Sequence, residues 1–490
     1  MFTEFCEQIY KFPGAQRAAR KVHMKLSDIR TALRKIRLSP ARTLGQNFLH
    51  DQNLARWIVD QAQITPEDYV VEIGAGLGAL TEFILEKGAR VLAIERDARL
   101  ADFLGTHLSH QRLEILNIDA LKFDPRFLFA HRRVKLLGNL PYNISSALLL
   151  KFLQQPNPIS LWLLMLQKEM AMRLSASPST HDYGALTLRV QLHHRVKYLR
   201  SVPATVFFPQ PDVDSAVVRI LPRDPLELPE RDEELLLGLI RVGFSQRRKQ
   251  LRKLLRDYAE DWDTIAQRLN INPKARAEEL SLLQWIDLAN FIAPVPHPDP
   301  RLTTSERFPI VDKKDRILGS ASRSEVHGNN LLHRAVHILI FNDAGEVYLQ
   351  QRSRWKDRHP LKWDSSAAGH VAAAERYDET ARRELKEELG VSVPLRKILK
   401  LPAARRTDHE FIWLYKGVVS SELAPNKCEI QRGIFLSPAV VDGWTSARPE
   451  DFAPGFLECW NAYRRKMPLD GKRPIRPRTF SEANDAASSA

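Results

Sequence analysis

The sequence has few cysteines and no long apolar run. Its three cysteines, Cys6, Cys428 and Cys459, are too few and too widely spaced for a disulfide framework or a cysteine zinc site. We therefore expect a reducing compartment, the cytoplasm. No stretch approaches the roughly 18 apolar residues of a membrane-spanning helix, and the N-terminus lacks the hydrophobic core of a secretory signal. These absences predict a chain without a membrane partner.

Acidic residues are also scarce relative to basic ones. Lys+Arg number 73 against 59 Asp+Glu, which gives a net charge of +14 and a pI of about 9.6. Such an excess indicates a polyanionic partner. Residues 1–45 contain ten basic and three acidic side chains, and both a solvated basic helix and an arm that contacts phosphates fit this pattern. Met24 is an alternative candidate for the true start, because the recognisable pattern begins just after it.

The pattern of apolar segments predicts an α/β fold. A chain of 490 residues is too long for one core, so two or three domains are expected. Apolar strands alternate with helices over the first half, which predicts a doubly wound parallel sheet that binds ligands beyond the carboxyl ends of its strands. The strands are expected at 69–73, 90–95, 113–119, 134–137 and 161–166, and a helix at 51–62.

Polar residues follow these strands at their carboxyl ends. The run Gly74-Ala-Gly76-Leu-Gly78 allows close approach of a ligand to the backbone, although many nucleotide-binding turns share it. Glu95 is placed to bind two ribose hydroxyls, and Asp119 to accept a hydrogen bond from an adenine amino group. Asn139 completes the set at the fourth strand. The combination favours S-adenosylmethionine over NAD as the cofactor.

The motif Asn139-Leu140-Pro141-Tyr142 suits methylation of an exocyclic amino group. The lone pair of adenine N6 is delocalised into the ring, so the free amine is a poor nucleophile. The Asn139 side-chain oxygen and the Leu140 carbonyl can accept the N6 hydrogens and free this lone pair, while Pro141 orients the backbone. The ring of Tyr142 offers a face on which a flipped base can stack, and such stacking stabilises the complex by roughly 1–3 kcal/mol. An ordinary proline turn after a strand is the alternative interpretation.

Helical periodicity follows from about residue 230 to 292. A basic amphipathic helix is predicted over 244–256, with Leu251, Leu254 and Leu255 toward a core. Its exposed bases predict a contact with structured RNA, although a merely solvated face is the alternative. The Pro-rich aromatic loop 202–211 is expected to form a wall against the base or to cap a sheet edge. The predicted RNA-binding residues are Arg247, Arg248, Lys249 and Arg252.

These motifs together resemble the ribosomal RNA adenine N6,N6-dimethyltransferases, in particular the small-subunit (16S) enzymes. The resemblance implies that Asn47, Leu49, Gly74, Glu95, Asp119 and Asn139 line the S-adenosylmethionine site. It also implies that the substrate is a hairpin near the 3′ end of 16S rRNA in an immature small ribosomal subunit, where two adjacent adenosines are each methylated twice. The large-subunit relatives usually carry Ile at the position of Leu140. The segments that carry the resemblance are 45–49, 71–78, 138–145, 167–169, 183–184, 203–217, 244–255 and 276–281.

A second motif lies in the last third of the chain. Gly369-x5-Glu375-x7-Arg383-Glu384-Leu-Lys-Glu387-Glu388-Leu-Gly390-Val has the spacing of the box of the Nudix hydrolases, which it resembles. Glu384, Glu387 and Glu388 fall on one face of a helix, where their repulsion favours a bound Mg²⁺ or Mn²⁺. Glu384 is expected to be a metal ligand or the general base. Gly390 is expected to end the helix, and Arg383 to pair with Glu375.

The residues around this box indicate a hydrolase. Segments 333–341 and 347–352 predict a hairpin with its turn at 342–345. Segment 308–312 and the pair His333-Arg334 resemble the Nudix branch close to isopentenyl diphosphate isomerase. That isomerase needs a cysteine before the helix, where this chain has Ser365 and Ser366. We therefore expect hydrolysis of a small molecule that contains a diphosphate. A Nudix fold kept as a binding module is the alternative.

The predicted architecture is a Rossmann-like S-adenosylmethionine-dependent methyltransferase with a C-terminal helical subdomain, plus a separate α/β/α Nudix domain, in an expected monomer. The alternatives for the first part are a DNA adenine-N6 methylase, a large-subunit rRNA methylase, and a ribosome-assembly factor for which methylation is secondary. The predicted parts are a basic extension (1–24), the methyltransferase domain (25–225), the helical RNA-binding subdomain (226–293), a Pro-rich linker (294–304), the Nudix domain (305–465) and a disordered tail (466–490).

Overall fold

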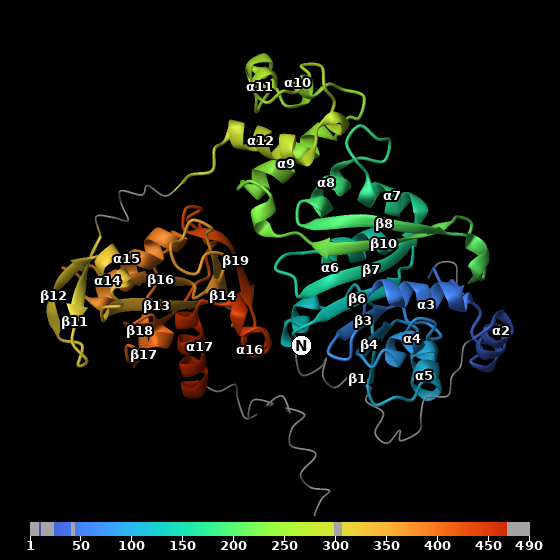
Figure 1. Cartoon of the computed structure of the whole chain (residues 1–490), viewed down its shortest axis with the longest axis horizontal. Helices are drawn as coiled ribbons and strands as arrows, with labels where there is room; N and C mark the ends of the chain where they lie inside the picture. Colours follow the sequence, from blue (N-terminus) through green and yellow to red (C-terminus); the bar gives the residue numbers. More distant parts are fainter. Residues whose placement is uncertain (1–8, 11–23, 41–44, 298–305, 468–490) are drawn as a thin grey trace, which may run out of the picture. The chain divides into compact units, whose positions relative to one another are not determined.

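The computed structural model describes residues 9–10, 24–40, 45–297 and 306–467 (Figure 1). Most of the basic extension, the end of the Pro-rich linker and the tail beyond 467 lie outside the described residues. The chain divides into a first unit, up to Val295 with Ala439–Arg448, and a second unit, Pro296–Pro438 with the residues from Pro449. In the ranges that the structure describes, no helix has both the length and the apolar character needed to cross a membrane.

An eight-stranded sheet forms the centre of the first unit (Figure 1). Its order is β1-β5-β4-β3-β6-β7-β10-β8, in which β5 to β7 run parallel and β1, β8 and β10 pair antiparallel with their neighbours. A separate short pair joins β2 to β9. The strands are β1 (Ile9–Tyr10), β2 (Phe48–Leu49), β3 (Tyr69–Ile73), β4 (Arg90–Glu95), β5 (Leu113–Asn117), β6 (Val134–Asn139), β7 (Ile159–Gln167), β8 (His194–Val202), β9 (Phe207–Phe208) and β10 (Ser215–Pro222).

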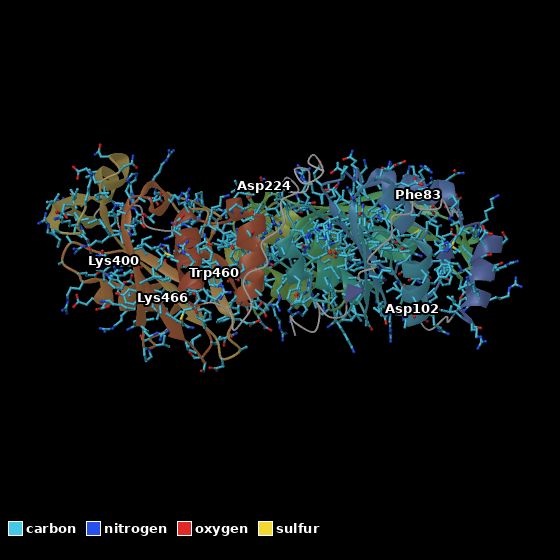
Figure 2. The ribbon with its side chains drawn as sticks, turned by 90° about the horizontal axis from the view of Figure 1, so that it is seen from below. Phe83, Asp102, Asp224, Lys400, Trp460 and Lys466 are labelled. Atoms are coloured by element: carbon cyan, nitrogen blue, oxygen red, sulfur yellow. The ribbon has the colours of Figure 1, made fainter. Side chains whose placement is uncertain are left out.

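Helices cover both faces of this sheet, which confirms the predicted doubly wound fold. Successive strand residues face opposite cores, so Val70 packs with α3, α4 and α5, and Val71 packs with α6 and α7. Figure 2 shows Phe83 on α4, which is buried, and Asp102 on α5, which is exposed. The helices are α2 (Leu26–Lys35), α3 (Gln52–Gln61), α4 (Thr81–Glu86), α5 (Ala98–His107), α6 (Ser145–Phe152) and α7 (Lys168–Ser175).

The strand register aligns the carboxyl ends of the central strands. Ile73 is level with Ile94 on one side and with Gly138 on the other, and Glu95 is level with Asn117. The residues that follow each strand therefore meet at a single edge of the sheet, as the alternating pattern predicts.

A helical subdomain follows the sheet. Its helices pack around Trp285, and the ring of that tryptophan lies so close to Gly243 that no Cβ fits there. The predicted helix over 244–256 is wrong: residues 244–250 form turns, and α10 spans only Leu251–Leu254. The helices after the sheet are α9 (Glu233–Gly243), α10 (Leu251–Leu254), α11 (Trp262–Arg268) and α12 (Leu282–Ile292). The helix α8 (Ala185–Gln191), which precedes β8 in the chain, packs into the same core.

Tertiary contacts explain this difference. The Leu251 N–H donates to the carbonyl of Ala275, a distant residue, instead of the carbonyl four positions earlier. Leu251 and Leu255 are buried in the core, and Leu254 is half-buried. These three leucines therefore face the core as predicted, although the helix that was expected to carry them is not continuous.

The second unit contains a seven-stranded sheet between two helices (Figure 1). β15-β14-β13-β18-β17 form its main path, β16 pairs with β13, and β19 pairs with β14. The predicted hairpin and its turn are present, with the Gly345 N–H donating to the carbonyl of Asn342. The strands are β13 (His333–Phe341), β14 (Val347–Arg352), β15 (Trp363–Asp364), β16 (Ala367–His370), β17 (Arg396–Leu401), β18 (Glu410–Val418) and β19 (Ile430–Leu436).

The two faces of β13 bury different helices. Val336 and Ile338 share a core with Leu385 of α15 (Tyr377–Leu389), whereas Phe341 contacts Tyr463 of α17 (Pro454–Lys466). Figure 2 shows Trp460 and Lys466 on α17. This arrangement is the predicted α/β/α sandwich. α14 (Arg323–Gly328) packs on the hairpin of β11 (Arg307–Val311) and β12 (Ile317–Ser322). The helix α16 (Pro438–Ala447) follows β19 in the chain, and its residues from Ala439 belong to the first unit.

Candidate active sites

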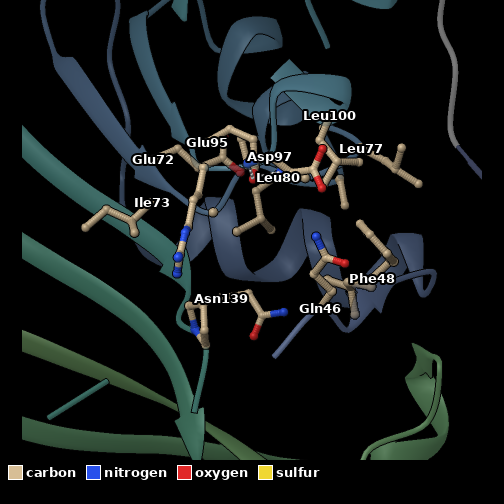
Figure 3. Close-up of a pocket in the computed structure, with 18 of the residues that line it drawn as sticks. Gln46, Phe48, Glu72, Ile73, Leu77, Leu80, Glu95, Asp97, Leu100 and Asn139 are labelled. Carbon is tan, nitrogen blue, oxygen red and sulfur yellow. Dashed lines mark hydrogen bonds between the residues drawn. The ribbon is translucent and has the colours of Figure 1, made fainter. Parts of the chain in front are cut away.

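A cavity of about 430 Å³ opens at the carboxyl edge of the first sheet (Figure 3). Its walls come from the turn after β3, from the ends of β4 to β6, and from the segment around β2. In Figure 3, Glu95 and Asp97 lie on one side of the cavity, and Gln46 and Asn139 on the other. All six predicted cofactor-binding residues line it: Asn47, Leu49, Gly74, Glu95, Asp119 and Asn139.

The turn after β3 brings its backbone to Glu95. Gly76 has a φ of +56°, which disfavours other residues, and its N–H donates to Glu95 Oε2 at 2.9 Å. The second oxygen of Glu95 accepts from the N–H of Asp97 at 2.9 Å. Burial raises the pKa of Glu95, although these two hydrogen bonds oppose the shift. The carboxylate is thus held in one orientation at the cavity wall, and each oxygen retains a second lone pair for a ligand.

Asp119 and Glu72 add two further carboxyl groups to the wall. Asp119 accepts from the N–H of Leu121 at 2.9 Å and lies 3.5 Å from the Arg96 guanidinium. Glu72 is buried and accepts from the Thr81 hydroxyl at 2.6 Å. Burial raises the pKa of Glu72 to about 8, so this side chain is protonated and uncharged at pH 7. Sequence reasoning missed Glu72, because an acidic residue within an apolar strand was the only signal.

The Asn139 motif surrounds the inner end of the cavity. The Asn139 Nδ2 donates to the carbonyl of Asn47 at 3.0 Å, and this bond leaves the side-chain oxygen as the available acceptor. Leu140 is buried, and its N–H donates to Met165 on β7. Tyr142 is half-buried, with its hydroxyl bonded to that of Ser215, so its ring is held in place. Pro141 and Asn143 line the cavity, while Leu140 and Tyr142 lie outside its lining.

The Pro-rich loop 202–211 meets the segment that carries Asn47 and Leu49. Its strand β9 pairs with β2, with Phe48 opposite Phe208 and Leu49 opposite Phe207. Phe207 is buried and Phe208 is half-buried, with the Arg30 guanidinium 5.1 Å from the Phe208 ring centre. The loop therefore braces one wall of the cavity.

The four predicted RNA-binding residues are exposed. Arg247, Arg248 and Lys249 lie in the turn after α9, and Arg252 lies on α10. Arg247 donates to the carbonyl of His181 at 2.8 Å, which anchors the turn. These bases therefore form one solvent-facing group, presented by a turn instead of the predicted long helix.

In the second unit, α15 carries the predicted glutamates into a cavity of about 750 Å³. Glu384, Glu387 and Glu388 all line it, with side-chain exposures of 13% for Glu384 and 56% for Glu387, and 4% exposure for Glu388. Gly390 ends the helix with a φ of +70°, as predicted. The carboxylates of the box therefore face one pocket.

The carboxyl groups of this pocket differ in their environment. Burial raises the pKa of Glu384 to about 8, with Glu388 adding to the shift, and burial also raises the pKa of Glu388. The predicted pairing of Arg383 is present, with its Nε donating to Glu375 at 2.8 Å and its Nη1 to Glu387 at 2.9 Å. A Cβ at Gly369 would overlap the Glu384 carboxylate, so this glycine makes room for it. A divalent cation fits this donor set, since it relieves the repulsion between the buried glutamates.

Sequence reasoning missed Lys356 and Glu429, which line this pocket and form an ion pair. It also missed Gln350, a buried residue behind the lining that donates to Glu388 at 2.9 Å. Burial lowers the pKa of Lys356. The basic run from Arg352 to Arg358 was the available signal, yet such runs usually mark solvated surface.

Both regions match known families. The family model described as Ribosomal RNA adenine dimethylase matches residues 39–294, and the model of the NUDIX domain matches residues 331–454. The chain is 38% identical over 267 residues to the Ribosomal RNA small subunit methyltransferase A of Geobacillus kaustophilus (strain HTA426), covering 52% of this chain and 91% of that protein. The protein of the same name from Chlorobium phaeobacteroides (strain BS1) is 40% identical over 255 residues, covering 52% and 94%.

A solved structure, that of the 23S rRNA methyltransferase ErmE, is 26% identical with a TM-score of 0.43, and covers 50% of this chain and 99% of that chain. Both matching families are families of enzymes. The match to residues 39–294 spans just over half of the 490 residues. The chain therefore belongs to the ribosomal RNA adenine dimethylase family, and it carries a NUDIX domain C-terminal to the methyltransferase region.

Proposed function

We propose that the first unit transfers methyl groups from S-adenosylmethionine to N6 of two adjacent adenosines in a hairpin loop near the 3′ end of 16S rRNA. The anchored Asn139 amide, with its oxygen free to accept beside the cavity, carries this proposal. Relatives named Ribosomal RNA small subunit methyltransferase A support the small-subunit substrate. We further propose that the substrate is the RNA of an immature subunit.

The cavity residues fit the cofactor. Glu95 and Asp119 offer carboxylate acceptors for hydroxyl and amino donors, and the glycine turn leaves backbone exposed for close approach. When bound, S-adenosylmethionine supplies an electrophilic methyl group. The hydrogen bond from Asn139 to Asn47 orients the Asn139 oxygen, so that this oxygen and the Leu140 carbonyl can accept the two N6 hydrogens. This acceptance localises the lone pair on N6, while the held ring of Tyr142 supports the flipped base.

The test uses the full chain and small subunits whose hairpin adenosines are unmodified. We expect incubation with S-adenosylmethionine to produce two dimethyladenosines, detected by mass spectrometry of the digested rRNA. Large subunits and duplex DNA are incubated in parallel. Methylation confined to either of those substrates would overturn the assignment in favour of a large-subunit or DNA methylase.

We also propose that the second unit hydrolyses a small molecule containing a diphosphate, with Mg²⁺ or Mn²⁺ held by Glu384, Glu387 and Glu388. When bound, the cation supplies positive charge to the diphosphate. Glu384 is nearly buried and has a raised pKa, which suits a group that exchanges a proton close to pH 7. Arg383 orients Glu387 through its 2.9 Å contact.

A panel of nucleoside and prenyl diphosphates tests this second activity. The full chain with Mg²⁺ is expected to release phosphate or a monophosphate product from at least one compound, and chelation should stop the release. A panel without any turnover, combined with saturable binding of one of its compounds, would replace the hydrolase with a binding module.

A further inference from the structure

Ser215 places a buried hydroxyl behind the motif at the inner end of the first cavity. Its Oγ is hydrogen-bonded to the phenol hydroxyl of Tyr142, 73 positions earlier in the chain. Ser215 is 0% exposed, whereas Tyr142 is half-buried, so the bond anchors the phenol end of a side chain that is otherwise accessible. A serine that is wholly removed from solvent cannot touch an RNA base itself. Any effect of Ser215 on the reaction must therefore pass through Tyr142.

The backbone that carries Ser215 is fixed on both sides. Ser215 begins β10, where it is level with Gln167 of β7 and with Val202 of β8. Because β10 lies between these two strands in the sheet, hydrogen-bond ladders hold it from both directions. Tyr142, in contrast, lies in the turn after β6. The Ser215 hydroxyl is thus a fixed point of the sheet to which a turn residue is tied.

Asp214 joins the same point to two further segments. Its carboxylate accepts from the N–H of Ala204 at 3.0 Å, and its carbonyl accepts from the N–H of Lys168, the first residue of α7, at 3.0 Å. Ala204 lies in the Pro-rich loop, whose strand β9 pairs with β2 at the wall of the first cavity. Two consecutive residues, Asp214 and Ser215, therefore set the Tyr142 ring relative to that wall.

The phenol group of Tyr142 holds the ring in place and takes no part in proton transfer. Burial raises the pKa of Tyr142, although the hydrogen bond to Ser215 opposes the shift. The phenol therefore keeps its proton at pH 7 and does not act as a base. Since the ring can otherwise move among several rotamers, the bond to Ser215 determines which way its face is turned.

The two methyl transfers to one adenosine differ in how the base is held. Unmodified N6 carries two hydrogens, which the Asn139 oxygen and the Leu140 carbonyl can both accept. After the first transfer N6 carries one hydrogen, so one acceptor loses its partner and the face of Tyr142 carries more of the positioning. In the second transfer the N6 lone pair forms the new C–N bond, the electron pair of the broken C–S bond stays on sulfur, and the last N6 proton leaves to water.

We propose that Ser215 is a positioning residue for dimethylation, which acts by fixing the Tyr142 ring and is needed most for the second transfer, to N6-methyladenosine. This role rests on the methyl transfer proposed for the first unit. Displacement of the reacting atoms by a fraction of an ångström slows such a reaction. A loosened ring should therefore leave monomethylated adenosine as an accumulating product.

The experiment follows both products over time with the full chain, S-adenosylmethionine and unmodified small subunits. Mass spectrometry of the digested rRNA measures N6-methyladenosine and N6,N6-dimethyladenosine. Ser215→Ala and Tyr142→Phe each remove one hydroxyl and should each slow the second transfer about tenfold, the effect of one lost hydrogen bond, and the first less than about threefold. The double variant should be no slower than either single variant, because the two hydroxyls form one bond.

Tyr198→Phe is the matched control. It removes the hydroxyl of another tyrosine–serine pair, in which the Tyr198 and Ser201 oxygens lie 2.6 Å apart on β8, outside the lining of the first cavity. Its product ratio should equal that of the wild type. Calorimetry should show unchanged S-adenosylmethionine binding in Ser215→Ala and Tyr142→Phe, which establishes that the cavity is intact.

Three results would overturn the role of Ser215: both transfers slowed equally, a product ratio unchanged in Ser215→Ala and Tyr142→Phe, or effects that multiply in the double variant. Tyr142 is only half-buried, so its phenylalanine variant decides the outcome even if Ser215→Ala fails to fold. A wild-type chain that forms no methyladenosine would overturn the proposed methyl transfer itself. A wild type that dimethylates beside variants with its own product ratio would overturn only the positioning role.

Discussion

The side-chain amide of Asn139 is bonded to the main-chain carbonyl of Asn47, 92 positions earlier, at 3.0 Å. This bond occupies an N–H of the amide and so determines which way its oxygen faces. It also joins β6 to the segment beside β2, and β2 in turn pairs with β9. One hydrogen bond thus couples the acceptor of the proposed chemistry to the wall of the first cavity.

Replacement of Asn139 tests this coupling. Asn139→Ala removes both the oxygen acceptor and the link to Asn47, so we expect dimethylation to be abolished while S-adenosylmethionine binding stays within about tenfold. Mass spectrometry of the rRNA and calorimetry measure the two effects. Asn329→Ala, an exposed amide in the second unit, is the matched control. Near-normal dimethyladenosine in Asn139→Ala would refute the assigned role.

Glu95→Ala should weaken binding of the cofactor. The variant loses the carboxylate that Gly76 and Asp97 hold at the cavity wall, and hydrogen bonds to a charged group are worth about 1.5–3 kcal/mol. Calorimetric titration with S-adenosylmethionine provides the measurement. Glu114→Ala, which alters a carboxylate bonded to Tyr69 and Arg90 outside the cavity, is the control. Unchanged affinity in Glu95→Ala would place the ribose elsewhere.

Glu72 predicts a pH-dependent stability. Burial raises its pKa from 4.5 to about 8, so the folded protein holds a proton that the unfolded chain releases. This contribution is complete below pH 4.5 and is lost as the pH rises through 8, at up to about 1.4 kcal/mol per pH unit. Glu72→Gln should lack this loss, so its urea midpoint should fall less than that of the wild type between pH 6 and pH 8.5. Parallel midpoints across this window would contradict the shift.

The basic turn predicts a salt-dependent interaction. Changing Arg247, Arg248, Lys249 and Arg252 to Gln should weaken binding to small subunits and reduce the slope of log K against log salt by about 0.7–0.9 for each phosphate that the protein no longer neutralises. The control changes Arg56, Lys87, Arg133 and Arg195, which pair with acidic residues of the same unit, and so matches the charge change. Equal slopes in the two variants would show that binding follows net charge and not the turn.

Glu387→Gln should separate the two activities. The variant keeps the size of the side chain but removes one carboxylate, so folding should persist while metal-dependent hydrolysis falls by roughly 10² or more. Methylation by the same purified protein should continue, because Glu387 lines the cavity of the second unit and Asn139 lines that of the first. Glu422→Gln, an exposed carboxylate outside the cavity, is the control. Unchanged hydrolysis in Glu387→Gln would exclude this residue as a ligand.

Local patterns in the sequence predict much of both sites. Apolar segments locate the central strands, and parallel strands end at a common edge, so the sequence alone predicts that Gly74, Glu95, Asp119 and Asn139 lie together, as they do in the first cavity. Helical spacing likewise places Glu384 and Glu388 on one face of α15. Such predictions succeed because each depends only on the period of one element and on a general rule of sheet topology.

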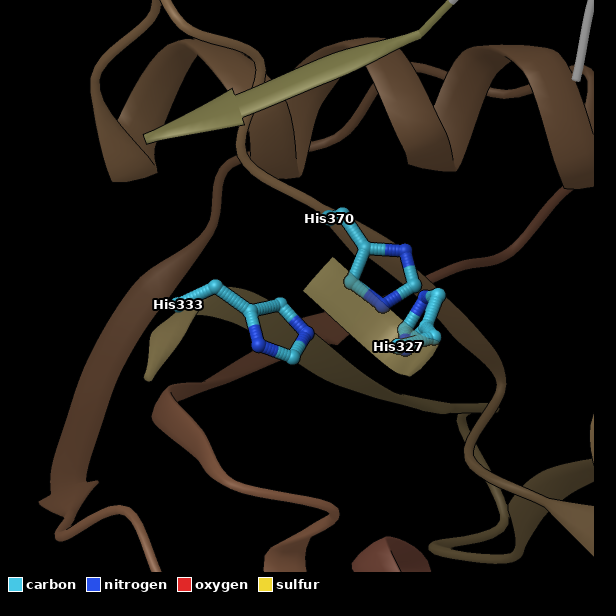
Figure 4. A group of neighbouring side chains, drawn as sticks. All are labelled: His327, His333 and His370. Atoms are coloured by element: carbon cyan, nitrogen blue, oxygen red, sulfur yellow. The ribbon is translucent and has the colours of Figure 1, made fainter. Parts of the chain in front are cut away.

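Long-range contacts determined the features that local patterns do not predict. The segment 244–256 has a helical pattern, yet packing around Trp285 and the bond from Leu251 to Ala275 interrupt it. Ring nitrogens of His327, His333 and His370 lie within 4.8 Å of one another (Figure 4), yet the positions of these three residues in the sequence follow no helical or strand period. Only the pairing of β13 with β16 and β18 brings His370 and Glu410 to His333. Periodicity thus determined the elements and their faces, whereas the histidine cluster required strand pairing between distant segments, an arrangement that local sequence does not encode.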